Sequence, residues 1–248
     1  MIIQLQKAKI SIITVVYNDC KNIERTIHSV LRQTYKDIEY IVIDGGSDDG
    51  TIEIIKKYKK SISTFISEPD NGIYDAMNKG ISLATGEYCC FMNSNDQFVN
   101  DHVIENLFKH NQQADILYGD TIIVNNGKEE IAKPLSLNKF WKRIPICHQS
   151  AFIKLELQKE YPYKLKYKVS SIYDFFYNCF YLGKKFQYVE LPVSKYDMNG
   201  YSSYSFYWLF DYFRIAWKYS GVKRFFVIGK LFSYTVMRVL AYLKHKTK

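Results

Sequence analysis

The first hundred residues alternate between two hydrophobic periods, and this alternation restricts the fold more than any other feature of the chain. Residues 10–16 (ISIITVV) form an almost continuous apolar run rich in β-branched side chains, which is typical of a strand buried on both faces. The apolar side chains that follow recur at the spacing of one face of an amphipathic helix: Ile23, Ile27, Val30 and Leu31. A strand followed by a helix is the repeating unit of a parallel sheet.

The same exchange of periods continues along the chain. It predicts further strands at 38–43, 64–67 and 88–92 and helices at 51–58 and 75–84. In the less regular second half we predict strands at 116–120, 121–125 and 186–191, a turn at 126–127 and a helix at 171–181. We therefore expect an α/β fold with a doubly wound, mainly parallel sheet and helices on both faces.

Polar residues follow each predicted strand of the first hundred residues. They are Tyr17-Asn18, Asp44-Gly45-Gly46-Ser47, Glu68-Pro69-Asp70-Asn71 and Asn93-Ser94-Asn95-Asp96. Ligands of doubly wound sheets bind outside the carboxyl ends of the strands, so these residues are expected to share one site. The site is acidic and rich in oxygen atoms.

Several common site motifs are absent from the sequence. No G-x-G-x-x-G follows the first predicted strand and no G-x-x-x-x-G-K-[ST] occurs, which excludes the usual phosphate loops of dinucleotide oxidoreductases and P-loop NTPases. No G-x-S-x-G elbow occurs, and the five histidines lack the close spacing of a transition-metal site. The five cysteines include no C-x-x-C pair, so we expect a reduced compartment.

Positive charge is concentrated at the end of the chain. The net charge is +9, and residues 201–248 hold nine Lys or Arg against one acid, Asp211. From residue 222 onward, apolar side chains share one face of a predicted helix, opposite most of the basic ones: Phe225, Phe232, Val236, Val239 and Leu243. This pattern predicts an amphipathic helical C-terminal arm on an anionic membrane surface. The alternative is a helix that packs its apolar stripe on the domain.

The apolar run near the N-terminus lacks a basic leader and a cleavage site, and no stretch reaches about 18 uncharged apolar residues. We therefore expect a cytoplasmic protein that is peripheral on the inner face of the cell membrane. Nucleic acid is not expected as a partner, because the predicted rim is acidic and no nucleic-acid module occurs.

The turn after the fourth predicted strand is a candidate metal site. Asp96, following Asn95, can place a carboxylate and an amide oxygen on one hard cation. Mg²⁺ and Mn²⁺ prefer such ligands, often completed by a substrate diphosphate. The alternative is that these residues serve only the backbone of a turn.

The order of the segments T-V-V-Y-N, I-V-I-D-G-G-S-D-D-G-T, E-P-D-N-G-I-Y-D-A-M-N-K-G and A-T-G-E-Y-C-C-F-M-N-S-N-D resembles the inverting glycosyltransferases of family 2, which have a GT-A fold. It is most similar to the branch that builds bacterial O-antigens, capsules and exopolysaccharides. The resemblance implies transfer of a hexosyl or N-acetylhexosaminyl group from a nucleotide-sugar, with UDP expected, to a lipid-linked or oligosaccharide acceptor. It divides the chain into a nucleotide-sugar-binding half (1–125), an acceptor-side half (126–200) and the arm (201–248).

The resemblance also implies residue roles around the donor. Tyr17 matches the aromatic that stacks on uracil, although it could equally cap the strand. Asp44 matches an acid near the uridine, and Gly45 replaces a second acid, which weakens strict selection of uracil. Asp96 matches the residue that reaches the Mn²⁺ or Mg²⁺ ion, with Asn95 in place of a neighbouring acid. The other residues implied to bind the donor are Thr14, Val15, Asp75, Asn78, Asn93 and His148.

The resemblance implies that Asp174 is the catalytic base. Inverting transfer needs a carboxylate on the acceptor side to take the proton of the attacking hydroxyl, a contribution of about 10²–10⁴-fold in rate. The alternative is a first-turn acid that stabilises a helix through its dipole. His148 is implied to face the diphosphate, although a lone histidine is more often structural.

Two other functions remain open. The replacements at Gly45 and Asn95 favour a non-catalytic, membrane-associated nucleotide-sugar-binding or scaffold protein that has kept the fold. A nucleotidyltransferase of similar fold normally has a Gly-rich phosphate loop with Arg or Lys after the first strand, and Tyr17-Asn18-Asp19-Cys20 does not supply one.

Overall fold

The computed structural model describes residues 8–109, 113–125, 127–197 and 207–219, and the single positions 221, 225 and 229. The first half contains β1 (Ile10–Val16), α1 (Ile23–Leu31), β2 (Ile38–Asp44), α2 (Thr51–Lys57), β3 (Thr64–Ser67), α3 (Ile73–Leu83), β4 (Tyr88–Phe91), β5 (Gln97–Phe98) and α4 (Val103–Leu107). The second half contains β6 (Ile116–Asn125), β7 (Lys128–Ala132), the 3₁₀ turns η1 (Leu137–Lys139) and η2 (His148–Ser150), β8 (Ala151–Lys154), α5 (Leu155–Glu160), α6 (Ser171–Tyr181), β9 (Phe186–Asp197) and α7 (Tyr207–Tyr219).

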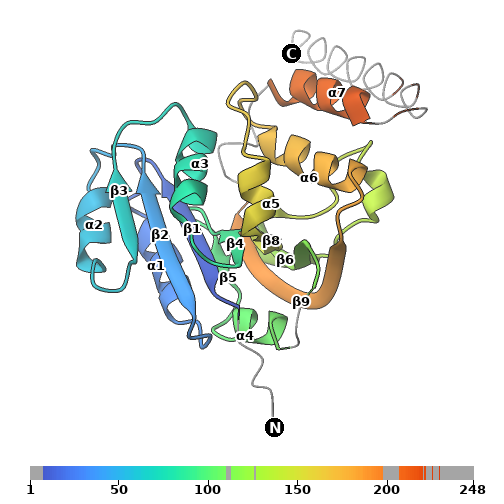
Figure 1. The fold of residues 1–248 in the computed structure, drawn as a ribbon. Coiled ribbons are helices and arrows are strands. Elements are labelled where there is room, and N and C mark those ends of the chain that lie inside the picture. Colours follow the sequence, from blue (N-terminus) through green and yellow to red (C-terminus); the bar gives the residue numbers. More distant parts are fainter. Residues whose placement is uncertain are drawn as a thin grey trace, which may run out of the picture.

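One curled sheet runs through the described part of the chain (Figure 1). Its order is β3-β2-β1-β4-β8-β6-β9-β5, and β7 pairs with β6 outside this order. The β3, β2, β1 and β4 strands are parallel, as are β6 and β9, whereas β8 is antiparallel to both of its neighbours. The predicted halves of the domain therefore share a continuous sheet, and their functional division stays a prediction.

The strand registers bring the carboxyl ends of the first strands together. Val16 pairs with Asp44, and Asp44 pairs with Ser67. Since β8 runs antiparallel to β4, the η2 turn that precedes β8 lies at the same edge as the carboxyl end of β4. This edge holds the polar segments that the sequence indicated.

Helices cover both faces of the sheet, which confirms the doubly wound prediction (Figure 1). On one face, Ile12 and Val42 pack in a buried cluster with residues of α1, α2 and α4. On the other face, Ile13 and Ile43 pack with residues of α3, α5, α6 and α7. Alternate residues of β1 thus enter opposite cores, as the almost continuous apolar run requires.

Two strand predictions in the second half were wrong in their bounds. The segments predicted as separate strands at 116–120 and 121–125 are one strand, β6. The strand predicted at 186–191 extends to Asp197 as β9, because its second half also pairs with β6. A register shift lies where the two strands approach closely: a Cβ at Gly119 would lie 2.4 Å from the Leu191 carbonyl oxygen. That shift keeps both strands continuous.

The described part of the arm is a helix packed on the domain. In α7, Ile215 and Ala216 are fully buried, and the Tyr212 ring stacks on Tyr173 of α6 at a centroid distance of 5.2 Å. Phe225 is 81% exposed. The rest of the predicted amphipathic stripe beyond residue 222 lies outside the described residues.

Candidate active site

Three loops meet at the carboxyl ends of β1, β2 and β4. The Asn18 backbone N–H donates to the Ser47 hydroxyl at 2.8 Å, which joins the first loop to the second. The Ser94 hydroxyl donates to the Asp19 carboxylate at 2.6 Å, which joins the first loop to the turn after β4. The segments predicted to share a site are therefore directly connected.

Asp44 organises the loop after β2. Its side chain is fully buried, and its carboxylate accepts hydrogen bonds from the backbone N–H groups of Gly46 and Ser47, both at 3.0 Å. The hydroxyls of Ser47 and Ser67 also donate to it, at 2.5 and 2.7 Å. Because four protein donors surround this carboxylate, Asp44 fixes the shape of the rim.

Tyr17, Gly45 and Asp70 form the open part of the rim. The Tyr17 side chain is 66% exposed, as a residue that offers its ring to a ligand must be. A Cβ at Gly45 would lie 2.6 Å from Asp70 Oδ2 and 3.3 Å from the Tyr17 ring. The absence of a side chain at Gly45 thus leaves room for the Asp70 carboxylate.

Asp70 is a candidate that the sequence analysis did not single out. The pattern placed it at the rim after β3, but several Asx residues stand there and spacing does not distinguish them. Its Oδ1 accepts from the Gly72 N–H at 2.7 Å, which leaves Oδ2 as the atom beside Gly45. The Asp70 carboxylate thus lies beside position 45, where the family resemblance leads us to expect an acid and this chain has glycine.

Thr14 and Val15 lie beneath the rim. The Thr14 hydroxyl is buried and donates to the Met92 carbonyl at 2.7 Å, and Val15 packs in the core. The Val15 carbonyl accepts from the Ser94 N–H at 3.2 Å. Both residues therefore hold the end of β4 against β1, and direct contact with a donor stays a prediction for them.

Asp75 and Asn78 lie on α3 and hold neighbouring segments. Asp75 accepts from the Asn71 backbone N–H at 3.0 Å and lies 3.8 Å from the Lys79 ammonium. The Asn78 amide makes two hydrogen bonds with the backbone of Tyr163, at 2.8 and 2.9 Å. Asn78 therefore fixes the 161–167 segment of the second half against α3.

The turn after β4 holds two buried side-chain oxygen atoms that have no hydrogen-bond partner. Asn95 has a φ of +82°, a left-handed conformation that asparagine tolerates better than most residues. The turn is held by Thr26, whose hydroxyl accepts from the Asn95 N–H at 3.0 Å and donates to the Asp96 carbonyl at 2.8 Å. The amide oxygens of Asn93 and Asn95 are buried without a hydrogen-bond partner.

These atoms suit a hard divalent cation. Asp96 supplies a carboxylate, 5% exposed, and Asn93 and Asn95 supply two amide oxygens that are otherwise unsatisfied. Mg²⁺ and Mn²⁺ take oxygen ligands and commonly bind through one or two carboxylates and a substrate phosphate. Within the described ranges, no three His, Cys, Asp or Glu side chains are grouped as a metal site, so any ion held here would depend on amide or substrate oxygens as well.

Gln149 connects this turn to the second half of the chain. Its amide NH₂ donates to Asp96 Oδ2 at 3.0 Å, and its carbonyl oxygen lies 3.1 Å from the Cys147 sulfur. The preceding residue, His148, is buried, and its ring stacks on Phe91 at a centroid distance of 4.9 Å. Burial lowers the pKa of the His148 imidazole to about 3, so the ring is neutral at pH 7.

His148 therefore packs as a core side chain. Its Nε2 lies 2.9 Å from the Tyr163 hydroxyl, while Nδ1 is buried with no hydrogen-bond partner. This environment favours the structural alternative that the sequence left open. The contact with a diphosphate expected for His148 stays a prediction.

Asp174 lies in the first turn of α6 under the C-terminal helix. It is 3% exposed, forms an ion pair with Lys164, and accepts a hydrogen bond from the Tyr219 hydroxyl of α7 at 3.2 Å. Burial and the nearby Asp174 carboxylate raise the pKa of Tyr219, which keeps this hydroxyl a donor. The Lys218 ammonium donates to the same hydroxyl at 2.6 Å, and burial lowers the pKa of Lys218.

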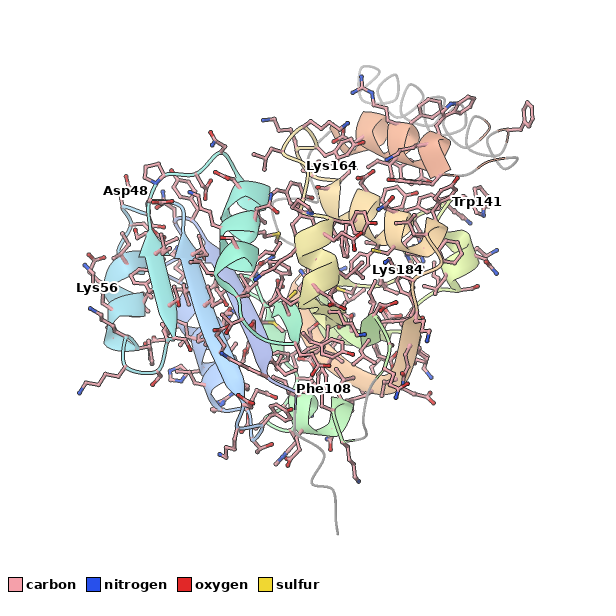
Figure 2. The ribbon with its side chains drawn as sticks, viewed as in Figure 1. Asp48, Lys56, Phe108, Trp141, Lys164 and Lys184 are labelled. Atoms are coloured by element: carbon pink, nitrogen blue, oxygen red, sulfur yellow. The ribbon has the colours of Figure 1, made fainter. Side chains whose placement is uncertain are left out.

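The two aspartates are linked through a short series of contacts. Gln149 donates a hydrogen bond to Asp96, and its sequence neighbour His148 contacts the Tyr163 hydroxyl. Lys164, which follows Tyr163 in the sequence, forms the ion pair with Asp174. Figure 2 shows Lys164 toward the same end of the molecule as Asp48, which follows the carboxyl end of β2. The side chain of Asp174 itself faces Lys164 and Tyr219.

Known proteins resemble this chain in sequence. A sequence model described as glycosyl transferase family 2 matches residues 11–178. A PGL/p-HBAD biosynthesis glycosyltransferase of Mycobacterium tuberculosis is 29% identical over 177 residues, which cover 68% of this chain and 69% of the relative. Glycosyltransferase GlyG of Streptococcus pneumoniae is 34% identical over 119 residues, which cover 47% of this chain and 38% of the relative.

Solved structures share the fold. The structure of S. aureus TarS 1-349 in complex with UDP-GlcNAc has a TM-score of 0.68 at 18% identity, covering 84% of this chain and 64% of TarS 1-349. The mannosyltransferase PcManGT from Pyrobaculum calidifontis, in complex with GDP-Man and Mn²⁺, has a TM-score of 0.59 at 16% identity, covering 77% of this chain and 57% of PcManGT. The chain thus spans less than two thirds of each structure, and the likeness confirms the predicted GT-A-like fold. No helix of the described residues is long and apolar enough to cross a bilayer.

Proposed function

The chain belongs to glycosyl transferase family 2, and we propose that it moves a sugar from a nucleotide-sugar to a hydroxyl of a glycan acceptor with inversion at the anomeric carbon. The observation that carries this proposal is the joining of the Tyr17 loop to the Asp96 turn through Ser94 at one edge of the sheet. The structure of TarS with UDP-GlcNAc and that of PcManGT with GDP-Man support a nucleotide-sugar donor. UDP is the nucleotide we expect.

Tyr17 and Asp70 are proposed to bind the nucleobase. The exposed Tyr17 ring offers a stacking surface, which is worth about 1–3 kcal/mol per base. The Asp70 carboxylate beside it can accept a hydrogen bond from a base N–H. Asp44 and Gly45 keep the loop shape that brings the two side chains together, and Asp75 and Asn78 border the pocket on α3.

Asp96, with the amide oxygens of Asn93 and Asn95, is proposed to hold Mn²⁺ or Mg²⁺. When bound, such an ion neutralises charge that develops on the departing diphosphate. Gln149 orients the Asp96 carboxylate through its hydrogen bond to Oδ2. The Mn²⁺ in the PcManGT complex supports a divalent metal as the cofactor.

Asp174 is proposed as the base that takes the proton of the attacking acceptor hydroxyl. Lys164 compensates its charge while Tyr219 covers it. An acceptor hydroxyl reaches this carboxylate only after Tyr219 withdraws. The proposal therefore requires α7 to move during turnover.

The acceptor is proposed to be a lipid-linked or oligosaccharide glycan of bacterial surface polysaccharide synthesis, and the transferred group a hexosyl or N-acetylhexosaminyl group. The basic residues beyond 222 would hold the protein at an anionic lipid surface, on the cytoplasmic side of the membrane. Because α7 covers Asp174, binding of the arm to lipid would move or hold the helix that lies over the proposed base.

A second candidate function is nucleotide-sugar binding without transfer. The observation that favours it is the burial of Asp174 between Lys164 and Tyr219, an arrangement that also suits a purely structural acid. In that case donor binding at Tyr17 and Asp70 would persist without turnover.

The two functions are separated by incubating the purified protein with a panel of UDP- and GDP-sugars and Mn²⁺. Release of nucleoside diphosphate, dependent on Asp96, supports the transferase. A shift in thermal stability with a donor, but no release with any donor or metal, supports the binding protein.

A further inference from the structure

A cavity of about 300 Å³ lies under the loop that follows β7. Its walls come from β6 at Gly119 and Thr121, from β7 at Ala132, and from the segments 133–135 and 143–147. The Leu135 N–H donates to the Pro145 carbonyl at 2.8 Å and so joins the two segments of the wall. The volume is at the lower end of small-molecule sites, about the size for one sugar residue.

The charge of the cavity wall is positive. Of the described residues that line it, Lys133 and Arg143 are basic and none is acidic. Lys133 is paired with Glu190 at 2.5 Å, so its charge is compensated. Arg143 is exposed and forms no ion pair among the described residues, which leaves one unpaired guanidinium at the site. A guanidinium binds carboxylates and phosphates through two parallel hydrogen bonds.

The cavity is connected to the candidate metal turn through Cys147 and Gln149. Cys147 is one of the wall residues of the cavity. The side-chain amide of Gln149 contacts the Cys147 sulfur through its oxygen at 3.1 Å and donates to the Asp96 carboxylate through its nitrogen at 3.0 Å. A ligand in the cavity is therefore separated from the Asp96 carboxylate by two side chains, those of Cys147 and Gln149. The donor rim lies on the other side of Asp96, toward β1 and β2.

We propose that this cavity binds the acceptor sugar and that Arg143 binds an oxyanion attached to it. The apolar wall residues Leu135 and Ile144 suit the C–H face of a sugar ring, and the backbone of the wall segments 133–135 and 143–147 offers polar groups for its hydroxyls. The oxyanion is either a phosphate, as in a sugar linked to a lipid through phosphate, or the carboxylate of a uronic acid. This inference rests on the proposed transferase, because it identifies the cavity as the acceptor subsite.

The test measures binding of small probes by ligand-observed NMR, with UDP and Mg²⁺ present so that the donor site is filled. The probes are N-acetylglucosamine 1-phosphate, glucuronate and neutral N-acetylglucosamine. The wild-type protein is expected to bind at least one anionic probe about tenfold more tightly than the neutral sugar. The anion that binds identifies the source of the charge.

Three variants locate the binding. Arg143→Gln is expected to remove the preference for the anionic probe, whereas Lys139→Gln, an exposed basic residue of the same loop outside the cavity wall, retains it. Ala132→Phe fills the cavity and is expected to abolish binding of every probe. Circular dichroism confirms that each variant is folded.

The outcomes separate this inference from the proposed function. If no anionic probe binds the wild type, or if Arg143→Gln binds it as tightly as wild type does, the acceptor subsite is wrong even though UDP binds. If the anionic probe binds through Arg143 but no nucleotide-sugar binds, the cavity is an anion site and the transferase proposal fails instead.

Discussion

The Tyr219 hydroxyl donates a hydrogen bond to the Asp174 carboxylate at 3.2 Å, so a residue of the C-terminal helix covers the proposed base. The same tyrosine ring contacts Tyr177 and Tyr181 of α6, at centroid distances of 5.1 and 5.6 Å. These ring contacts thus attach α7 to α6 directly beside the proposed base.

Asp174→Asn tests the role of this carboxylate. We expect transfer to fall by about 10²-fold or more, because the amide cannot take a proton, while donor binding stays within about twofold. Initial rates of UDP release in the presence of acceptor measure transfer, and thermal shifts with the UDP-sugar measure donor binding. Unchanged turnover would make Asp174 a structural partner of Lys164.

Tyr219→Phe tests whether the Tyr219 hydroxyl stabilises α7 over Asp174. The ring contacts remain, but the hydroxyl loses two hydrogen bonds, the one to the buried Asp174 carboxylate and the one from Lys218, which is expected to cost about 1–3 kcal/mol of unfolding free energy. Urea denaturation measures this loss. Tyr181→Phe is the matched control, since the Tyr181 side chain is 65% exposed and only its ring packs on Tyr219. Equal stability of the two variants would show that the hydrogen bonds of the Tyr219 hydroxyl contribute nothing.

Tyr17→Ala tests the stacking surface. Removing the ring is expected to weaken UDP binding by about tenfold or more, in line with roughly 1–3 kcal/mol for stacking on a base. Tyr17→Phe keeps the ring and should bind UDP nearly as the wild type does. Isothermal titration with UDP and Mg²⁺ measures both. A Tyr17→Ala protein with wild-type affinity would exclude the ring from the nucleotide site.

Gly45→Ala tests the placement of Asp70. A methyl group at position 45 would lie 2.6 Å from Asp70 Oδ2, so the carboxylate must move. We expect UDP binding to weaken by roughly three- to tenfold, and the double variant with Asp70→Ala to bind no worse than Asp70→Ala alone, because both changes remove one interaction. Fully additive losses would show that Gly45 acts independently of Asp70.

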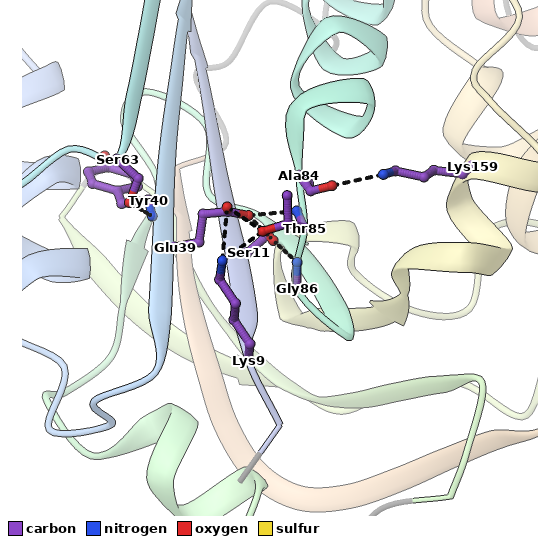
Figure 3. A network of polar contacts seen from close by, with 9 residues as sticks. All are labelled: Lys9, Ser11, Glu39, Tyr40, Ser63, Ala84, Thr85, Gly86 and Lys159. Atoms are coloured by element: carbon purple, nitrogen blue, oxygen red, sulfur yellow. Dashed lines mark hydrogen bonds and ion pairs between the residues drawn. The ribbon is translucent and has the colours of Figure 1, made fainter. Parts of the chain in front are cut away.

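Glu39 predicts a pH dependence of stability at the opposite edge of the sheet. Figure 3 shows its carboxylate among Lys9, Ser11 and Thr85, which donate to it at 2.6–3.2 Å. Burial alone would raise the pKa of Glu39, but these hydrogen bonds outweigh it and lower the pKa from 4.5 to about 2. The stabilisation is therefore fully present above about pH 4.5 and is lost as the pH falls toward 2.

Glu39→Gln is accordingly expected to lower the unfolding free energy by roughly 1–2 kcal/mol at pH 7 and by less at pH 3. Glu53→Gln, on the exposed face of α2, is the matched control and should be neutral at both values. Urea denaturation at the two pH values measures the difference. If Glu39→Gln lowers the unfolding free energy by the same amount at pH 3 as at pH 7, the lowered pKa of Glu39 does not contribute to stability.

The fold could be predicted from the sequence because the first half consists of local signals. The buried run of β1 and the spacing of Ile23, Ile27 and Val30 each specify one element without reference to the rest of the chain. The long strands β6 and β9 were divided or shortened because their continuity depends on pairing across about 70 residues and on a register shift at Gly119.

The candidate site was predictable as a set of loops but not as a set of contacts. Strand ends identified Asp44 and Asp96, since topology alone brings them to one edge. Whether a side chain faces a ligand depends on neighbours distant in sequence: Asp70 lies beside Gly45, and Gln149 lies on Asp96. For the same reason the burial of Asp174 under Tyr219 has no signal in the local sequence around either residue.

Metal-dependent transfer through Asp96 is decided by measuring UDP release from a UDP-sugar by the wild-type protein and by Asp96→Asn, each with Mn²⁺ and with EDTA. We expect release by the wild type only with the metal, and a loss of about 10²-fold or more in Asp96→Asn at unchanged thermal stability. Equal release by both proteins, or release by the wild type that EDTA does not reduce, would contradict it.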